Sequence, residues 1–161
     1  ESRRLNDTDN STDGSLNSYK NNYYNKVMSF IKNENTFPIN VSHQSLSDVL
    51  TTLGRKATKK DKKVKGYLDI NFGVSDITFK IENDTRSTDI QMYGDDIAIR
   101  GIRDVKITLQ VDFLIKFNKL KLINNVNLYI NENLPLILET KFGAGRIKLY
   151  YLVSPRVEIQ E

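Results

Sequence analysis

The side chains best able to do chemistry in this sequence are its lysines and arginines. The run 55-RKATKKDKKVK-65 carries seven basic residues and one acid, and Lys116, Lys119 and Lys121 form a second group. Concentrated, mobile cations attract polyanions even though the net charge of the chain is only +4. The run favours nucleic acid as a partner, although disordered loops and localisation signals have the same composition.

Other chemistries are poorly supported by the residue types present. The chain has no cysteine, which excludes disulfides, thiolate metal sites and cysteine nucleophiles. His43 is the only histidine, and its neighbours indicate a helix start at the surface. No carboxylate pair, phosphate-binding glycine loop or nucleophile–base set has a meaningful spacing. We therefore expect a protein that is not an enzyme and that needs no metal or cofactor.

The absence of cysteine and the polar first residues of the chain also indicate the cellular compartment in which the protein works. The first residues, 1-ESRRLNDTDN-10, do not resemble a signal peptide. The longest apolar runs are far shorter than the roughly 20 residues that a membrane helix needs. These features favour a reducing intracellular compartment.

Two helices are expected to position the basic residues. The first spans 42–54, where Ser42 or Ser45 can cap the start and Gly54 suits a left-handed residue after the end. Its inward stripe is Leu46, Val49, Leu50 and Leu53.

The second helix is expected over 110–122. Asp112, Lys116 and Lys119 share its outward face. Its inward stripe is Val111, Leu114, Phe117 and Leu120.

The remaining elements are strands with alternating apolar residues. Turns are expected at 73–76 and at Gly143–Gly145. The order predicts an α+β fold with two helices packed on one face of an antiparallel sheet. The expected strands are 37–41, 67–72, 76–82, 88–93, 96–102, 104–110, 125–131, 134–139 and 147–153.

The domain organisation follows from where the apolar patterning begins. Residues 1–36 read as a flexible tail or interdomain connector, because their first part is polar and rich in Asn, Asp and Ser. Within them, 23-YYNKVMSFI-31 suits either a short helix or an extended connector. The domain itself is expected over 37–158, with 159–161 as a tail.

The end of the chain carries a specific pattern. The stretch 126-VNLYINENLPLILETKFGAGRIKLYYLVSPRVE-158 resembles the carboxyl end of sliding clamps of the proliferating cell nuclear antigen (PCNA) family. The Leu-Pro-Leu strand, the glycine turn, the Tyr-Tyr-Leu strand and a proline-basic-apolar-acid tail follow in order. The tail has one residue more before Pro155 than the usual form. The similarity in element order extends over 36–158.

This resemblance implies a mechanical role. In the family, domains close head to tail into a ring, helices line the central hole, and duplex DNA passes through without sequence readout. Sliding requires attraction to phosphates rather than contacts to base edges. The resemblance therefore implies DNA-binding roles for Lys116, Lys119, Lys121, Arg55, Lys56, Lys59 and Lys60, whereas Lys62, Lys63 and Lys65 stay open.

The family also binds short peptide motifs of polymerases, ligases and nucleases at the end of the last strand. Carried over, the pocket wall is Pro135, Tyr151, Leu152, Val153 and Pro155. Connector residues that could complete it are Val27, Met28, Phe30 and Ile31. Ordinary sheet core is the alternative for Tyr151 and Leu152, because alternation puts one of them inward.

A subunit interface is expected on the strand 88–93, which corresponds by order to the edge strand that pairs with the neighbouring subunit. An unpaired edge is an association site unless it is blocked. An internal strand is the alternative. The implied interface residues are Asp89, Ile90, Gln91, Met92 and Tyr93.

The function implied is that of a polymerase processivity factor in DNA replication and repair. Its expected partners are duplex DNA, DNA polymerase, other clamp-binding proteins, a clamp loader and further copies in a ring, which is a trimer if the full-length subunit has two domains. The expected location is the nucleus or a viral replication site. A checkpoint-type clamp, a viral transcription factor on the same fold and a plain protein-interaction module are the alternatives.

Overall fold

The computed structural model describes residues 21–57, 66–73, 75–82, 87–93, 97–99, 104–121 and 124–156. The chain divides between Glu34 and Asn35 into two units. The first contains a helix over 21–31, so the helical alternative for this segment is correct. The described helices include none long and apolar enough to cross a membrane.

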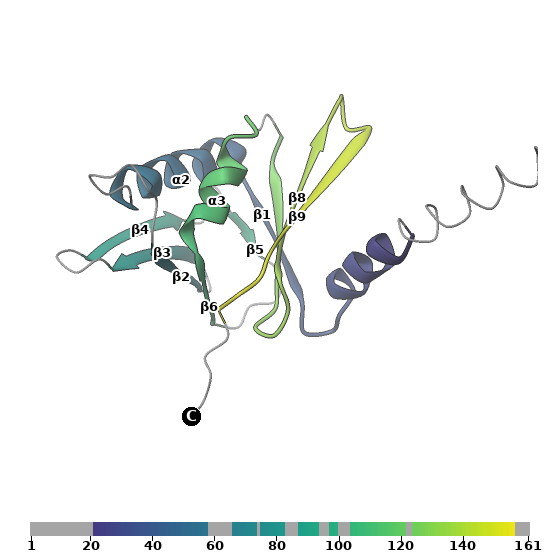
Figure 1. The fold of residues 1–161 in the computed structure, drawn as a ribbon, viewed down its shortest axis with the longest axis horizontal. Coiled ribbons are helices and arrows are strands. Elements are labelled where there is room, and N and C mark those ends of the chain that lie inside the picture. Colours follow the sequence, from purple (N-terminus) through teal and green to yellow (C-terminus); the bar gives the residue numbers. More distant parts are fainter. Residues whose placement is uncertain are drawn as a thin grey trace, which may run out of the picture. The chain divides into compact units, whose positions relative to one another are not determined.

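The second unit contains all the other elements (Figure 1). Its helices are α2 (His43–Ala57) and α3 (Val111–Asn118). The strands before α3 are β1 (Phe37–Val41), β2 (Tyr67–Phe72), β3 (Asp76–Glu82), β4 (Ser87–Tyr93), β5 (Ile97–Ile99) and β6 (Val105–Gln110). Three strands follow α3: β7 (Val126–Ile130), β8 (Leu136–Phe142) and β9 (Ile147–Val153).

The α+β prediction is confirmed, and the strands divide between two antiparallel sheets rather than forming one. One sheet has the order β5-β1-β7-β8-β9 and the other β4-β3-β2-β6. Short turns join β2 to β3 and β8 to β9, whereas β1 pairs with β5 and with β7, which are distant in sequence. Local patterning does not reveal these distant pairings.

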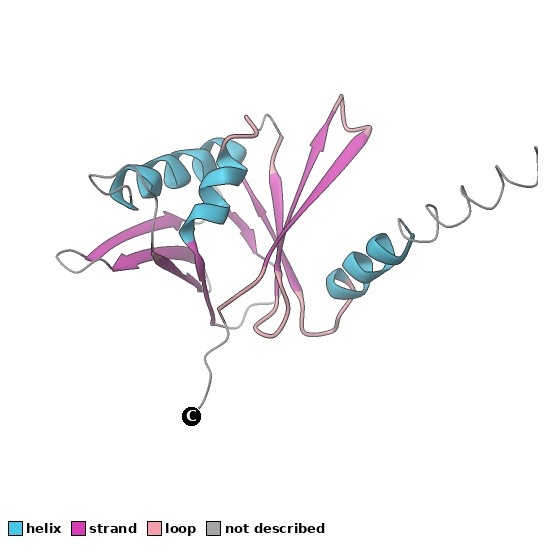
Figure 2. Cartoon of the chain, viewed as in Figure 1, coloured by secondary structure: helices cyan, strands magenta, loops and turns pink. Residues whose placement is uncertain are grey.

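One hydrophobic core joins both sheets and both helices. Alternate residues of each strand point into it, as Leu68, Ile70 and Phe72 do from β2. The α3 residues Val111, Leu114 and Phe117 are buried in the same cluster. Figure 2 shows the two helices beside each other, which agrees with their direct contacts.

The start of α2 is as expected, but its end is not. The Ser45 backbone N–H donates to the Ser42 hydroxyl at 3.4 Å, so Ser42 caps the helix. The helix continues past Gly54 to Ala57, so the prediction of a left-handed Gly54 is wrong. A Cβ added at Gly54 would lie 3.8 Å from Ile115 Cδ1, so this glycine marks where α3 approaches α2.

The second helix is shorter than expected because its last turn tightens. The N–H groups of Lys119 and Leu120 bond to carbonyls three residues back, and Lys121 has φ 49°. Leu120 therefore leaves the predicted inward stripe and is 42% exposed. The turn after β8 follows the prediction, with positive φ at Gly143, Ala144 and Gly145.

The position of Gly54 within α2 predicts a stabilising substitution. Gly54→Ala should raise the free energy of unfolding by about 0.5–1 kcal/mol, because alanine loses less backbone entropy and its Cβ meets Ile115 at an ordinary contact distance. Thermal unfolding followed by circular dichroism measures the change. The matched control, Gly145→Ala, should lose about 1 kcal/mol because its φ is +83°. A loss of stability at Gly54 would contradict the packing.

Candidate functional site

The two helices form a shallow groove where they meet. Asn118 Nδ2 donates to Thr51 Oγ1 at 3.1 Å, and Gly54 allows Ile115 to pack closely. The groove has a volume of about 350 Å³. Its lining residues are Leu50, Thr51, Gly54, Arg55, Ile115, Asn118 and Lys119.

Two predicted DNA-binding cations meet at this groove. Arg55 comes from α2 and Lys119 from the turn after α3, and both are exposed. Lys121 is also exposed, two residues further on. The side chain of Lys56 and the whole of Lys59, Lys60, Lys62, Lys63 and Lys65 lie outside the described residues.

Lys116 has a different environment on α3. Its Nζ lies 3.7 Å from Asp112 Oδ2 and 5.6 Å from the centroid of the Phe113 ring. The ion pair reduces the positive charge that Lys116 presents to solvent. Asp112 and Phe113 are therefore parts of this surface that the sequence interpretation gave no role, although the i,i+4 spacing of Asp112 and Lys116 was a readable signal.

Strand β9 has alternate residues on its two faces. Tyr151 packs on the Phe117 ring with centroids 5.2 Å apart, and its hydroxyl donates to the Phe113 carbonyl at 2.8 Å. Burial first, and then the charge of Asp112, raise the pKa of Tyr151. Val153 is buried, whereas Leu152 is 40% exposed. Of the three β9 residues predicted to line the pocket, Leu152 is the exposed one.

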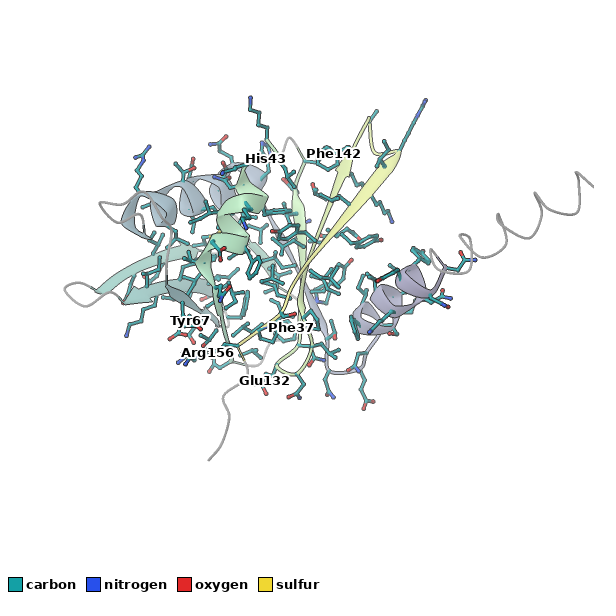
Figure 3. All side chains as sticks on the ribbon, in the orientation of Figure 1. Phe37, His43, Tyr67, Glu132, Phe142 and Arg156 are labelled. Atoms are coloured by element: carbon teal, nitrogen blue, oxygen red, sulfur yellow. The ribbon has the colours of Figure 1, made fainter. Side chains whose placement is uncertain are left out.

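The prolines of the predicted pocket, Pro135 and Pro155, are half-buried. Beyond Pro155 the tail is fastened to β6. The Arg156 N–H donates to the Thr108 carbonyl at 2.7 Å, and the Arg156 guanidinium lies 4.3 Å from the centroid of the Tyr67 ring (Figure 3). Val27, Met28, Phe30 and Ile31 lie on the helix of the other unit and are half-buried.

The predicted interface strand β4 is the outermost strand of the described four-stranded sheet. Ile90 packs against the core and Met92 is buried in it, because they pair with Phe79 and Ile77. Asp89 and Gln91 are exposed. Tyr93 pairs through its backbone with Asp76. The exposed side chains of this edge are therefore polar.

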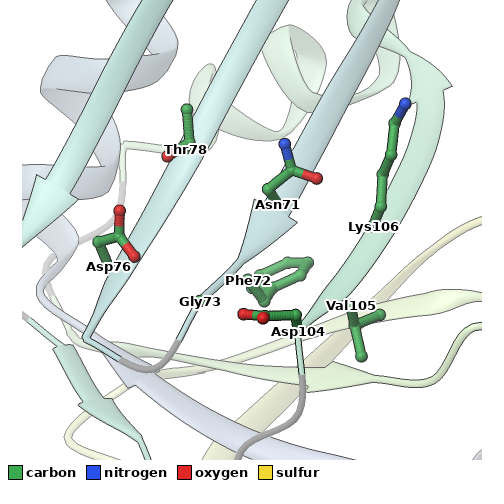
Figure 4. A pocket seen from close by; sticks show the side chains of 8 residues that line it. All are labelled: Asn71, Phe72, Gly73, Asp76, Thr78, Asp104, Val105 and Lys106. Carbon is green, nitrogen blue, oxygen red and sulfur yellow. The ribbon is translucent and has the colours of Figure 1, made fainter.

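A hollow of about 340 Å³ lies at one end of the four-stranded sheet (Figure 4). Asp76 and Asp104 contribute carboxylates to it. Lys106, also in its wall, pairs with Asp69 at 3.3 Å. Among the described residues, no cluster of three or more His, Cys, Asp or Glu side chains could hold a metal ion.

Comparisons with known proteins agree with this architecture. No family model matches the chain. A curated DNA polymerase sliding clamp from Methanosarcina barkeri is 26% identical over 107 residues, covering 65% of this chain and 43% of the relative.

Solved structures share the fold. The proliferating cellular nuclear antigen of Entamoeba histolytica has a TM-score of 0.63 and 17% identity, covering 78% of this chain and 47% of that one. A DNA polymerase III subunit beta from Borrelia burgdorferi has a TM-score of 0.62 and 15% identity, covering 81% and 32%. The chain thus spans less than half the length of each of these proteins. The clamp relative and the shared fold confirm the predicted resemblance: this chain has the fold of a sliding-clamp domain.

Proposed function

We propose that this domain is part of a ring that encircles duplex DNA and acts as a processivity factor. The observation that carries the proposal is the meeting of Arg55 and Lys119, from two neighbouring helices, at one exposed groove. Lys121 and the basic run after α2 add charge near these positions in the sequence. Phosphates are the natural ligands of such a surface.

The groove suits binding that ignores DNA sequence. Its cations belong to long side chains, and the groove is shallow, so phosphates rather than base edges are within reach. A clamp that slides must exchange phosphate contacts easily. The polar edge of β4 and the likeness to sliding clamps support a ring of several domains. The proposed place of action is the nucleus or a viral replication site.

The outer end of β9 is the proposed attachment point for DNA polymerase and other client proteins, with a clamp loader assembling the ring. Leu152 offers an exposed apolar side chain, with the half-buried Pro155 three residues on. An apolar anchor of this kind suits a short peptide motif. The role is tethering, with no catalysis by the domain itself.

Charge removal at the groove tests the DNA contact. Arg55→Ala combined with Lys119→Ala should lower the slope of log affinity against log salt by about 2, because two phosphate contacts are lost. Fluorescence anisotropy with a duplex of mixed sequence, at several salt concentrations, measures the slope. The control, Arg146→Ala with Lys148→Ala, removes equal charge at two exposed residues, one in the β8–β9 turn and one at the start of β9. Equal effects of the two double variants would remove the groove from the DNA path.

The ion pair of Lys116 predicts a gain of affinity. Asp112→Asn should tighten duplex binding several-fold at low salt, since it removes a repelling charge and releases Lys116 from its partner. The same anisotropy assay reports the change. The control Asp48→Asn removes an acid on the exposed face of α2. If Asp112→Asn binds duplex DNA no more tightly than the wild-type chain does, Lys116 does not face DNA.

The exposure of Leu152 predicts its role in client binding. Leu152→Ala should weaken binding of a polymerase-type clamp-interaction peptide about tenfold, because an exposed apolar anchor is lost. Fluorescence titration of a labelled peptide measures the affinity. Ile147→Ala is the control, because Ile147 is 61% exposed at the other end of β9. If the wild-type chain shows no saturable binding, this end of β9 is not a client site.

A further inference from the structure

A second hollow, with a volume of about 560 Å³, lies at the end of the five-stranded sheet where Figure 3 labels His43 and Phe142. It is bounded by the start of α2, the segment before β7 and the β8–β9 turn. Polar side chains dominate its wall, among them Asn40, Asn125, Glu139 and Lys141. Pro135 precedes β8 and Leu152 pairs with Ile137 near the start of that strand, whereas the cavity lies at its other end, so it is separate from the proposed client site.

Strand register builds a row of hydrogen bonds along this cavity. Asn40 of β1 lies opposite Asn127 of β7, which lies opposite Glu139 of β8. Asn40 Nδ2 donates to Asn127 Oδ1 at 2.7 Å, and Asn127 Nδ2 donates to Glu139 Oε1 at 3.0 Å. Asn125 Nδ2 begins the row by donating to Asn40 Oδ1 at 3.4 Å. All three donations run toward the carboxylate.

Glu139 is a buried acid held by neutral donors. It is 7% exposed, and besides Asn127 it accepts from the Tyr129 hydroxyl, at 3.4 Å and again at Oε1. Burial first, then the charge of Glu139 and the hydrogen bond to it, raise the pKa of Tyr129, which therefore stays a neutral donor. Within the described part of the chain, the ion pairs do not include Glu139. A buried carboxylate without a cationic partner is costly.

Thr140, the next residue of β8, points to the opposite face of the sheet from Glu139. It is 1% exposed and lines the same cavity, and its Oγ1 has no hydrogen-bond partner among the described residues. The β7–β8 pairing reaches only Glu139, so Thr140 lies past the end of that ladder. The acceptors on the Glu139 face of the cavity are therefore the Glu139 carboxylate and the side-chain carbonyl oxygen of Asn125.

We propose that the polar cavity binds a guanidinium group, supplied by an arginine side chain of a partner protein or by a small arginine-like molecule. A planar guanidinium offers five donors, is weakly hydrated and suits buried pairing with a carboxylate. His43 and Lys141 also line the cavity and would favour an anion. A cation is nevertheless the expected ligand, because the carboxylate of Glu139 is buried and has no cationic partner within the described part of the chain.

The test is a titration of the isotope-labelled 161-residue chain, followed by NMR, with N-acetyl-argininamide. Binding should be saturable and should shift the side-chain amide signals of the asparagine row. N-acetyl-citrullinamide, which has a similar shape without the charge, and inorganic phosphate should not bind. Saturable binding of either probe at these signals, or no binding of the arginine probe, would overturn the proposal.

Variants locate the site. Glu139→Gln should weaken binding at least tenfold, whereas the control Glu132→Gln, at an exposed carboxylate, should leave it unchanged. If Glu139→Gln does not fold, Asn125→Ala replaces it and should weaken binding several-fold, because Asn125 lines the cavity and is exposed. Wild-type affinity in the folded variant contradicts the site. A peptide with a central arginine that binds much more tightly than the single residue identifies a protein partner, whereas equal affinity identifies a small molecule.

Discussion

The close contact between α2 and α3 is the constraint on which the exposed surface depends. Gly54 has no side chain, so Ile115 packs against α2, and the Asn118–Thr51 hydrogen bond fixes the contact. Both helices bury their apolar stripes in the core that the two sheets share. Once those stripes are buried, the polar residues of both helices can only face outward, which brings Arg55 and Lys119 to one groove.

Strand β9 shows how one short segment serves two surfaces. Side chains alternate across a strand, so Tyr151 and Val153 join the helix side while Leu152 is exposed. The Tyr151 hydroxyl donates to the Phe113 carbonyl of α3. Leu152, the exposed residue of the proposed client site, therefore lies next in sequence to a side chain that contacts the helix. Substitution of Tyr151 would therefore disturb both surfaces, whereas substitution of Leu152 tests the outer one.

Much of the fold could be predicted because its signals are local. Alternation identified β1, β2, β3 and β9 at their observed bounds, and Ser42 was one of two caps named. The division into two sheets was not readable, since β1 pairs with β7 across a long stretch of chain. The sequence predicts an end of α2 at Gly54, whereas the helix continues to Ala57. Gly54 suits either a left-handed cap or a close contact between helices, and only the packing distinguishes the two.

Some features of the candidate site follow from local sequence, whereas others depend on tertiary contacts. The structure brings Arg55 and Lys119 together, but their meeting depends on the tertiary contact between two helices. Tyr151 and Leu152 were correctly expected to face opposite sides, because that follows from strand geometry alone. The row from Asn40 to Glu139 gave no signal, since it exists only through the register of three strands.

The charges on the helix pair also suit a protein that must hold DNA without stopping on it. Each phosphate contact by a mobile lysine is weak and screened by salt, so many such contacts can hold a duplex while any one exchanges freely. The Asp112–Lys116 pair lowers the charge at one position and leaves Arg55 and Lys119 to act at the groove. A helix pair whose exposed cations included an unpaired Lys116 would bind more tightly and would exchange more slowly. The acid on α3 therefore has a physical reason to lie beside the lysines that are proposed to face DNA.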